Sequence, residues 1–193
     1  MSSTNRSSSR DAHISDYYIT PVSDIRLFLR EFDSAVNLDW TRCKILDPCA
    51  GGDNNNPMSY PSALRNEFDV MFVDTIDIRD DSLAHIKRDY LEYDVDDKPD
   101  IVITNPPFKY AQNIIQKSLI DVKDSGWVVM LLRLNFFGSK QRKPFWDKFM
   151  PRYVFVHHKR IGFIEGGGTD SIEYAHFCWQ KGNYPKFCEL KVI

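Results

Sequence analysis

The sequence lacks the features of membrane, secreted and metal-binding proteins. No apolar run approaches the roughly 20 residues that a membrane helix needs, and residues 1–16 are rich in serine and arginine without the apolar core of a signal peptide. The 4 cysteines form no Cys-x-x-Cys pair, so we expect free thiols, a cytoplasmic location and no zinc site. His157, His158 and His176 lie in apolar patterns, so we expect packed histidines rather than metal ligands.

Two common phosphate-binding motifs are also missing. The chain contains neither Gly-x-x-x-x-Gly-Lys-Ser/Thr nor Gly-x-Gly-x-x-Gly, so it is poorly equipped for phosphate-bearing nucleotides. It does contain a glycine turn at 48–53, followed along the chain by the carboxylates of Asp74, Asp77 and Asp89. Acidic loops favour a cofactor that has hydroxyl groups, an amine and a positive charge but no phosphate. S-adenosylmethionine meets these requirements.

Strand-like and helix-like segments alternate along the chain, which predicts an α/β fold with a largely parallel sheet. A first amphipathic helix should start at Thr20-Pro21, with Thr20 as its cap. The last two strands have only a glycine-rich loop at 165–170 between them, so they should pair antiparallel. The expected strands lie near 43–47, 70–76, 100–104, 127–134, 152–158 and 174–180, and the other expected helices near 60–67, 80–87, 110–122 and 141–149.

The most informative motif is Asn105-Pro106-Pro107-Phe108, which directly follows the apolar run 100–104. A short buried strand delivers its last residues to the carboxyl edge of a sheet, where open α/β folds keep their active sites. Proline fixes its own φ and restricts the residue before it, so the carbonyls of Asn105 and Pro106 are held in set directions.

The spacing of this motif from Asp47 indicates a shared cleft. One βαβ unit takes about 30 residues, so Asp47 and Asn105 are separated by two such units. In a doubly wound sheet this places their strands side by side at the switch point, with both loops opening into one pocket.

The motif suits methyl transfer to an amino nitrogen. An aromatic amine is a poor nucleophile because its lone pair is delocalised into the ring. If the Asn105 side-chain oxygen and the Pro106 carbonyl each accept one N–H bond, the nitrogen becomes tetrahedral and its lone pair faces an incoming methyl group. Phe108 offers a flat face on which a flipped base can stack, a contact worth roughly 1–3 kcal/mol per base.

These motifs, in this order, resemble those of the N6-adenine DNA methyltransferases, whose catalytic domain is Rossmann-like. The resemblance runs from about Tyr17 to Lys181 and implies S-adenosylmethionine as cofactor and a flipped adenine in DNA as target. It implies catalytic roles for Asn105, Pro106, Pro107 and Phe108, and cofactor contacts from Thr20, Pro21, Asp47, Pro48, Cys49, Gly51, Asp77 (ribose), Asp89 and Tyr90 (adenine).

The chain departs from this family in two places. It has Asp53 where members of the family usually have glycine, and the loop after it is unusually polar. Only about a dozen residues follow Trp179, so we expect one catalytic domain at 17–193 after a disordered arm at 1–16, without a separate target-recognition domain. Strict site specificity would then need an oligomer or a partner subunit.

Charge is distributed unevenly, although the net charge is only -2. Acids concentrate between Asp69 and Asp100, whereas the segment 133–160 is strongly basic and contains Asp147 as its single acid. Such a footprint favours binding to the phosphates of nucleic acid, with a solvated helix face as the alternative interpretation. The basic residues are Arg133, Lys140, Arg142, Lys143, Lys148, Arg152, Lys159 and Arg160, of which Lys140, Arg142, Lys143 and Arg160 are the candidate nucleic-acid contacts.

Taken together, the sequence predicts an S-adenosylmethionine-dependent methyltransferase for the adenine amine of DNA. Methylation of RNA adenine or of a protein glutamine amide remains open, because a side-chain amide fits the same clamp. A third possibility is a catalytically silent subunit that binds nucleic acid or cofactor. The family resemblance also implies the cytoplasm of a bacterial or phage-infected cell.

Overall fold

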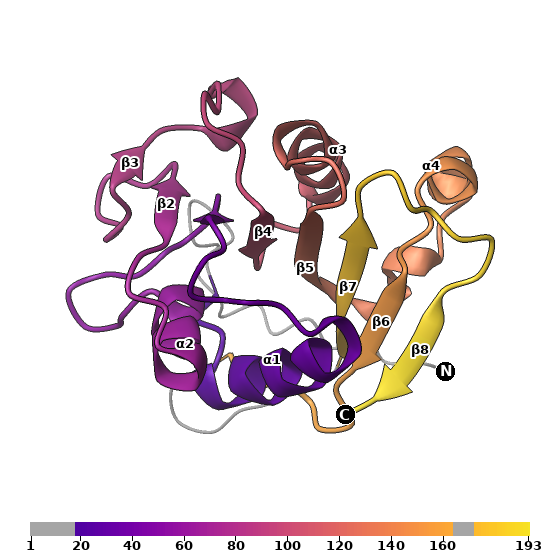
Figure 1. The fold of residues 1–193 in the computed structure, drawn as a ribbon, viewed down its shortest axis with the longest axis horizontal. Helices are drawn as coiled ribbons and strands as arrows, with labels where there is room; N and C mark the ends of the chain where they lie inside the picture. The colour runs from indigo at the N-terminus through magenta and orange to yellow at the C-terminus, as the bar shows by residue number, and fades with distance from the viewer. Residues whose placement is uncertain (1–17, 164–171) are drawn as a thin grey trace, which may run out of the picture.

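The computed structural model describes residues 18–163 and 172–193, so the arm expected at 1–16 and the loop expected at 165–170 lie outside the described residues. A single mixed sheet forms the middle layer, and helices cover both of its faces (Figure 1). The strands are β1 (Ile45–Asp47), β2 (Asp74–Asp77), β3 (Ile86–Lys87), β4 (Ile101–Thr104), β5 (Trp127–Arg133), β6 (Tyr153–Val156), β7 (Tyr174–Gln180) and β8 (Glu189–Val192). The helices are α1 (Val22–Val36), α2 (Ser59–Phe68), α3 (Ala111–Asp121) and α4 (Lys143–Lys148), with 3-10 turns at Tyr90–Glu92, Leu134–Phe137 and Lys140–Arg142.

The strand order is β3-β2-β1-β4-β5-β7-β6-β8, and β1 to β5 are parallel. β1 pairs directly with β4 in the register Ile45↔Ile101. The strand order therefore reverses between β1 and β4, which places the loops after Asp47 and Thr104 together at the switch point. The predicted α/β class and the predicted neighbouring strands are both confirmed.

Apolar periodicity explains how the two outer layers pack. The stripe Ile25, Phe28, Leu29 and Phe32 of α1 is completely buried and packs with α2 against one face of the sheet. Helices α3 and α4 cover the other face with a second apolar cluster. Strand β4 is buried along its whole length, as expected for a central parallel strand covered on both faces.

The prediction of a helix at 80–87 is wrong. The chain forms turns there and then the short strand β3, which pairs parallel with β2. The Thr75 hydroxyl accepts a hydrogen bond from the His85 backbone N–H at 2.9 Å and lies 3.0 Å from His85 Nδ1. These tertiary contacts hold the segment extended beside β2, and they override the weak helical pattern.

Two further expectations about element ends are corrected. Thr20 does not cap α1, because the cap position is Pro21 and no side chain caps the helix. The strand expected at 70–76 begins only at Asp74 and ends at Asp77.

The antiparallel pairing expected for the last two strands is confirmed, since β7 runs antiparallel to both β5 and β6. Another strand, β8, follows it and pairs parallel with β6. All four residues of β8 are exposed, and its polar–apolar alternation covers only four residues, so the strand was not predicted.

Candidate active site

The first loop of the site follows β1. Asp47 is fully buried, and its Oδ1 accepts a hydrogen bond from the Cys49 backbone N–H at 3.2 Å. Its Oδ2 accepts no hydrogen bond from any described residue. Burial raises the pKa of this carboxyl to about 7, because a charged group loses its hydration there. The nearby Thr104 hydroxyl, which also has no hydrogen-bond partner among the described residues, offsets part of this rise in pKa, so both side chains keep unused polar atoms at the switch point.

The glycines of this loop are required by its geometry. Gly51 and Gly52 have φ values of 62° and 74°, in the left-handed region that favours glycine. A Cβ on Gly52 would lie 2.8 Å from Met58 Cγ, so even alanine would force a rearrangement. The loop is also tied to β2, because the Ala50 N–H donates to the Ile76 carbonyl at 3.0 Å. A narrow backbone-lined turn results.

Asp77, the last residue of β2, anchors the same loop. Its Oδ2 accepts the Gly51 N–H at 2.7 Å and its Oδ1 accepts the Arg79 N–H at 2.9 Å. Asp74 lies at the other end of β2 and forms an ion pair with Lys44 at 3.6 Å. Of these two carboxylates, only Asp77 therefore stands at the carboxyl edge of the sheet.

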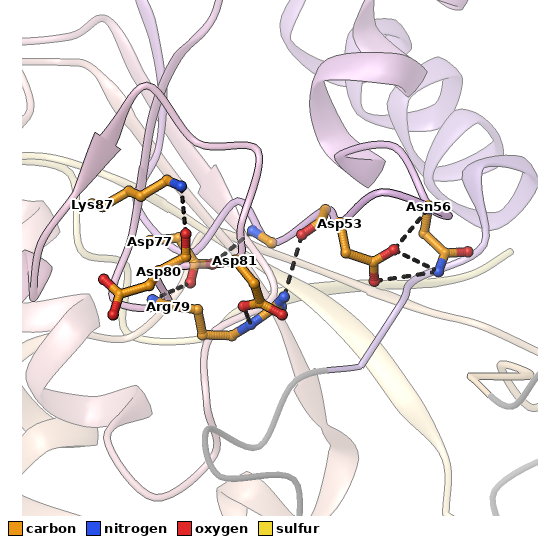
Figure 2. A network of polar contacts seen from close by, with 9 residues as sticks. Asp53, Asn56, Asp77, Arg79, Asp80, Asp81 and Lys87 are labelled. Atoms are coloured by element: carbon orange, nitrogen blue, oxygen red, sulfur yellow. Dashed lines mark hydrogen bonds and ion pairs between the residues drawn. The ribbon is translucent and has the colours of Figure 1, made fainter.

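Figure 2 shows how the polar loop around Asp53 is arranged. The Asp53 carboxylate binds within its own loop, where its Oδ1 accepts the N–H groups of Asn55 and Asn56 at 2.8 and 2.9 Å. Arg79 crosses from β2 and donates to the Gly52 carbonyl at 3.3 Å and to Asp81 at 3.0 Å. Asp53 thus acts as a turn former, and the Arg79 side chain fixes the glycine turn from outside.

Asp89 and Tyr90 lie at the 3-10 turn after β3. Asp89 caps this turn by accepting the Leu91 N–H at 2.9 Å. Tyr90 is buried, and its hydroxyl donates to Asp121 of α3 at 2.8 Å. The hydroxyl is therefore bound on the α3 side, and the role predicted for this pair in adenine recognition stays a prediction.

The second loop of the site follows β4 and carries the Asn-Pro-Pro-Phe motif. Asn105 Nδ2 donates to the Thr20 hydroxyl at 3.1 Å, which orients the amide. Its side-chain oxygen is buried and accepts no hydrogen bond from any described residue. A buried acceptor without a partner is costly, so such atoms in native proteins generally need an explanation. The sequence predicted Thr20 for the site, but as a helix cap and cofactor contact, not as the partner of Asn105.

Aromatic side chains enclose the motif on its outer side. The Phe108 ring lies 6.2 Å from Tyr18 and 5.9 Å from Tyr174, measured between centroids. Phe163 packs against both of these tyrosines. Arg133, the last residue of β5, places its guanidinium carbon 4.3 Å from the centre of the Phe108 ring. In the sequence, Arg133 was recognised only as a basic residue. Its position at the end of a long buried strand could have predicted that it lies at the site.

The basic segment begins at this edge of the sheet, but its side chains differ in their contacts. Arg142 donates to the Phe136 carbonyl at 2.8 Å and covers the Phe136 ring. Lys143 pairs with Asp147, Arg160 with Glu173 at 3.4 Å, and Lys140 is exposed. Arg142 is therefore partly structural, whereas Lys140 and Lys143 face solvent.

The remaining titratable groups are packed into the structure. His157 and His176 are buried 2.9 Å apart (Nε2 to Nδ1), Tyr60 lies 3.0 Å from His176 Nε2, and burial lowers the pKa of His157 to about 4. The expectation of packed histidines is confirmed for these two, whereas His158 is exposed. All 4 cysteines are free. Within the described residues, no helix has the length and apolarity needed to cross a membrane.

Comparison with known proteins identifies the fold. No protein-family model and no curated protein matches the sequence. Among solved structures, a Listeria monocytogenes protein assigned as a class I S-adenosylmethionine-dependent methyltransferase is similar over 92% of this chain and 66% of its own, with a TM-score of 0.69 and 15% identity. A Pyrococcus horikoshii protein assigned as an RNA methyltransferase matches 85% of this chain and 87% of its own, with a TM-score of 0.59 and 16% identity.

The M protein of the type I restriction enzyme EcoKI is also similar, over 88% of this chain and 45% of its own, with a TM-score of 0.55 and 14% identity. This chain thus spans just under two thirds of the first of these structures and less than half of the M protein. At such low identity the likeness shows the fold alone: the chain has the Rossmann-like fold of class I methyltransferases.

Proposed function

We propose that this chain is an S-adenosylmethionine-dependent methyltransferase that acts on the exocyclic amine of adenine in DNA. The observation that carries the proposal is the buried, unsatisfied oxygen of Asn105, beside the glycine turn of β1. An N–H of the substrate would satisfy this acceptor. The fold likeness to the EcoKI M protein supports a DNA substrate.

The residues of the first loop fit the proposed cofactor. Gly51 has a left-handed backbone and no side chain to keep a ligand from its backbone, whereas the Cβ position of Gly52 is already filled by Met58 and Leu83. The free Oδ2 of Asp47 can accept a hydrogen bond from an ammonium group, and a neighbouring cation would favour the charged form of this carboxyl. Asp77, at the carboxyl edge of the sheet, would accept the ribose hydroxyls in addition to the Gly51 and Arg79 N–H groups that it already binds. When bound, S-adenosylmethionine supplies an electrophilic methyl group.

On the target side, Asn105 and Pro106 would orient the amine. Two acceptors draw the amine toward tetrahedral geometry, so that its lone pair faces the methyl group. Because these acceptors are fixed before the reaction, they stabilise positive charge on the nitrogen without reorganisation. The nitrogen would take the methyl group from the sulfonium, whose carbon–sulfur bond breaks to leave S-adenosylhomocysteine, and would then lose a proton to water, so no strong base is required. Phe108 provides the stacking surface for the base.

The proposal is tested by methyl incorporation from labelled S-adenosylmethionine into four substrates: duplex DNA, single-stranded DNA, RNA and ribosomal protein. We expect label in DNA, recovered as N6-methyladenine, and incorporation that is slower by about 10²-fold or more with Asn105→Ala. Label found only in RNA or only in protein would show that the substrate is RNA or protein and not DNA. The fold likeness to the Pyrococcus protein makes RNA the first alternative. Cofactor binding without transfer to any substrate would indicate a silent subunit.

A further inference from the structure

The guanidinium of Arg133 covers one face of Phe108. Its central carbon lies 4.3 Å from the ring centre, which is a stacking distance, and its Nε donates a long hydrogen bond of 3.4 Å to the Tyr174 hydroxyl. The residue is half-buried at the carboxyl end of β5. A planar cation therefore occupies a position on Phe108 that a planar base would also require.

The charge of Arg133 has no carboxylate partner among the described residues. Two other cations of the basic segment are paired, since Arg160 contacts Glu173 and Lys143 contacts Asp147. A guanidinium held only by a ring face and a hydroxyl keeps its capacity to bind an anion, and its planar fork matches the oxygens of a phosphate.

The neighbours of Phe108 differ in how easily they can move. Tyr174 is buried in β7 and packs against Phe163, so its displacement would disturb the sheet. The Arg133 side chain is long and half-exposed, and a cation–π contact at such a site is weak. Rotation of Arg133 is the least costly way to open this face of Phe108.

We propose that Arg133 is a substrate-contacting residue that the target nucleotide displaces. In the free protein it covers Phe108, and in the complex the base takes this place while the guanidinium binds the adjacent phosphate. This inference rests on the proposed function, because it requires a base that stacks on Phe108. It gives Arg133 two separable effects on substrate affinity: the side chain competes with the base for Phe108, and it binds the phosphate.

Two probes separate these effects. Adenosine carries the base without phosphate, and an adenine-centred trideoxynucleotide carries both. Affinities are measured by titration calorimetry or NMR with saturating S-adenosylhomocysteine, which keeps adenosine out of the cofactor site. Arg133→Ala should bind adenosine about two to five times more tightly, since a weak cation–π contact no longer competes. It should bind the trinucleotide at least about ten times more weakly, because a charged hydrogen bond is lost.

Arg133→Lys keeps the charge without the planar fork, so its affinity for the trinucleotide should lie between those of Arg133→Ala and the unmodified protein. The matched control is Arg152→Ala, which also removes an arginine that donates to a tyrosine hydroxyl and covers an aromatic ring, at the opposite edge of the sheet. We expect it to change neither affinity. Thermal unfolding of each variant verifies that it is folded.

Arg133→Ala would overturn the proposal if it weakened adenosine binding, which would make Arg133 a wall of the base pocket, or if it left both affinities unchanged. The proposed function fails in a different way. If the unmodified protein transfers methyl groups to no nucleic acid and binds neither probe, both claims are refuted. If it methylates DNA normally and Arg133→Ala has unchanged affinities for both probes, only the proposal about Arg133 is refuted.

Discussion

The loops after β2 and after β4 lie at the same edge of the sheet, yet their polar side chains are used differently. Both carboxylate oxygens of Asp77 accept hydrogen bonds from backbone N–H groups of the chain itself. The side-chain oxygen of Asn105 accepts no hydrogen bond from the described residues. The loop after β2, on the proposed cofactor side, is thus held by internal contacts, whereas the loop after β4, on the proposed target side, keeps an acceptor for a partner. Variants of the two loops should therefore fail in different ways.

The largest effect is expected at Asn105. Asn105→Ala should lower single-turnover methyl transfer by about 10²-fold or more, because it removes an acceptor used mainly in the transition state. Affinity for S-adenosylmethionine and the unfolding midpoint should remain nearly unchanged. Asn113→Ala, at an exposed position of α3, is the matched control and should behave like the unmodified protein. Normal turnover in Asn105→Ala would remove this residue from the reaction.

The next largest effect concerns Asp77. Asp77→Ala should weaken cofactor binding by roughly 1.5–3 kcal/mol for each hydrogen bond to the carboxylate that is lost. Unlike Asn105→Ala, it should also lower the free energy of unfolding, because the Gly51 and Arg79 N–H groups lose their acceptor. Calorimetry and urea unfolding measure the two effects. Asp74→Ala is the control, and an equal loss of affinity there would contradict the assignment of the ribose contact to Asp77.

A smaller effect should appear in the pH dependence of stability without ligand. The pKa of Asp47 is raised from 3.8 to about 7, so the folded state holds a proton that the unfolded state has released. This contribution to stability therefore falls as pH rises from about 4 to about 7, by roughly 2 kcal/mol between pH 5 and pH 7. Neutral His157, with its pKa lowered to about 4, has the opposite effect below pH 6.5.

The difference in stability between the unmodified protein and Asp47→Asn isolates the carboxyl, because both proteins contain the same histidines. We expect Asp47→Asn to gain stability relative to the unmodified protein as pH rises through this window, as measured by urea unfolding at several pH values. A difference that stays constant with pH would show that Asp47 is charged throughout.

The smallest effect is expected from the exposed lysines of the basic segment. Reversing charge at Lys140 and Lys143 should weaken binding to all DNA sequences about equally, and should reduce the slope of log affinity against log salt by about 1.8 if each lysine contacts one phosphate. Lys186→Glu is an exposed control. An unchanged slope would support the solvated-face interpretation. Arg142 is left intact because it holds the Phe136 carbonyl.

Local patterns were enough to predict most of the sheet and the position of the motif. The α1 stripe and the buried β4 are set by apolar periodicity, which is a property of neighbouring residues. The prediction failed at 80–87, where contacts of Thr75 with His85 decide the structure, and at β8, where a short exposed strand is held by pairing with β6. In both places partners distant in the sequence outweigh local preference.

The sequence by itself determined that Asn105 follows a buried strand, that two prolines fix its loop and that a glycine turn lies two units upstream. These are properties of a few consecutive residues. Only the tertiary structure decided that Thr20, 85 positions away, orients the Asn105 amide, that the amide oxygen has no partner among the described residues and that Arg133 covers Phe108. The reason is physical: a hydrogen bond or a stacked ring depends on distances of a few ångströms between atoms of separate strands, and such distances exist only once the sheet has formed.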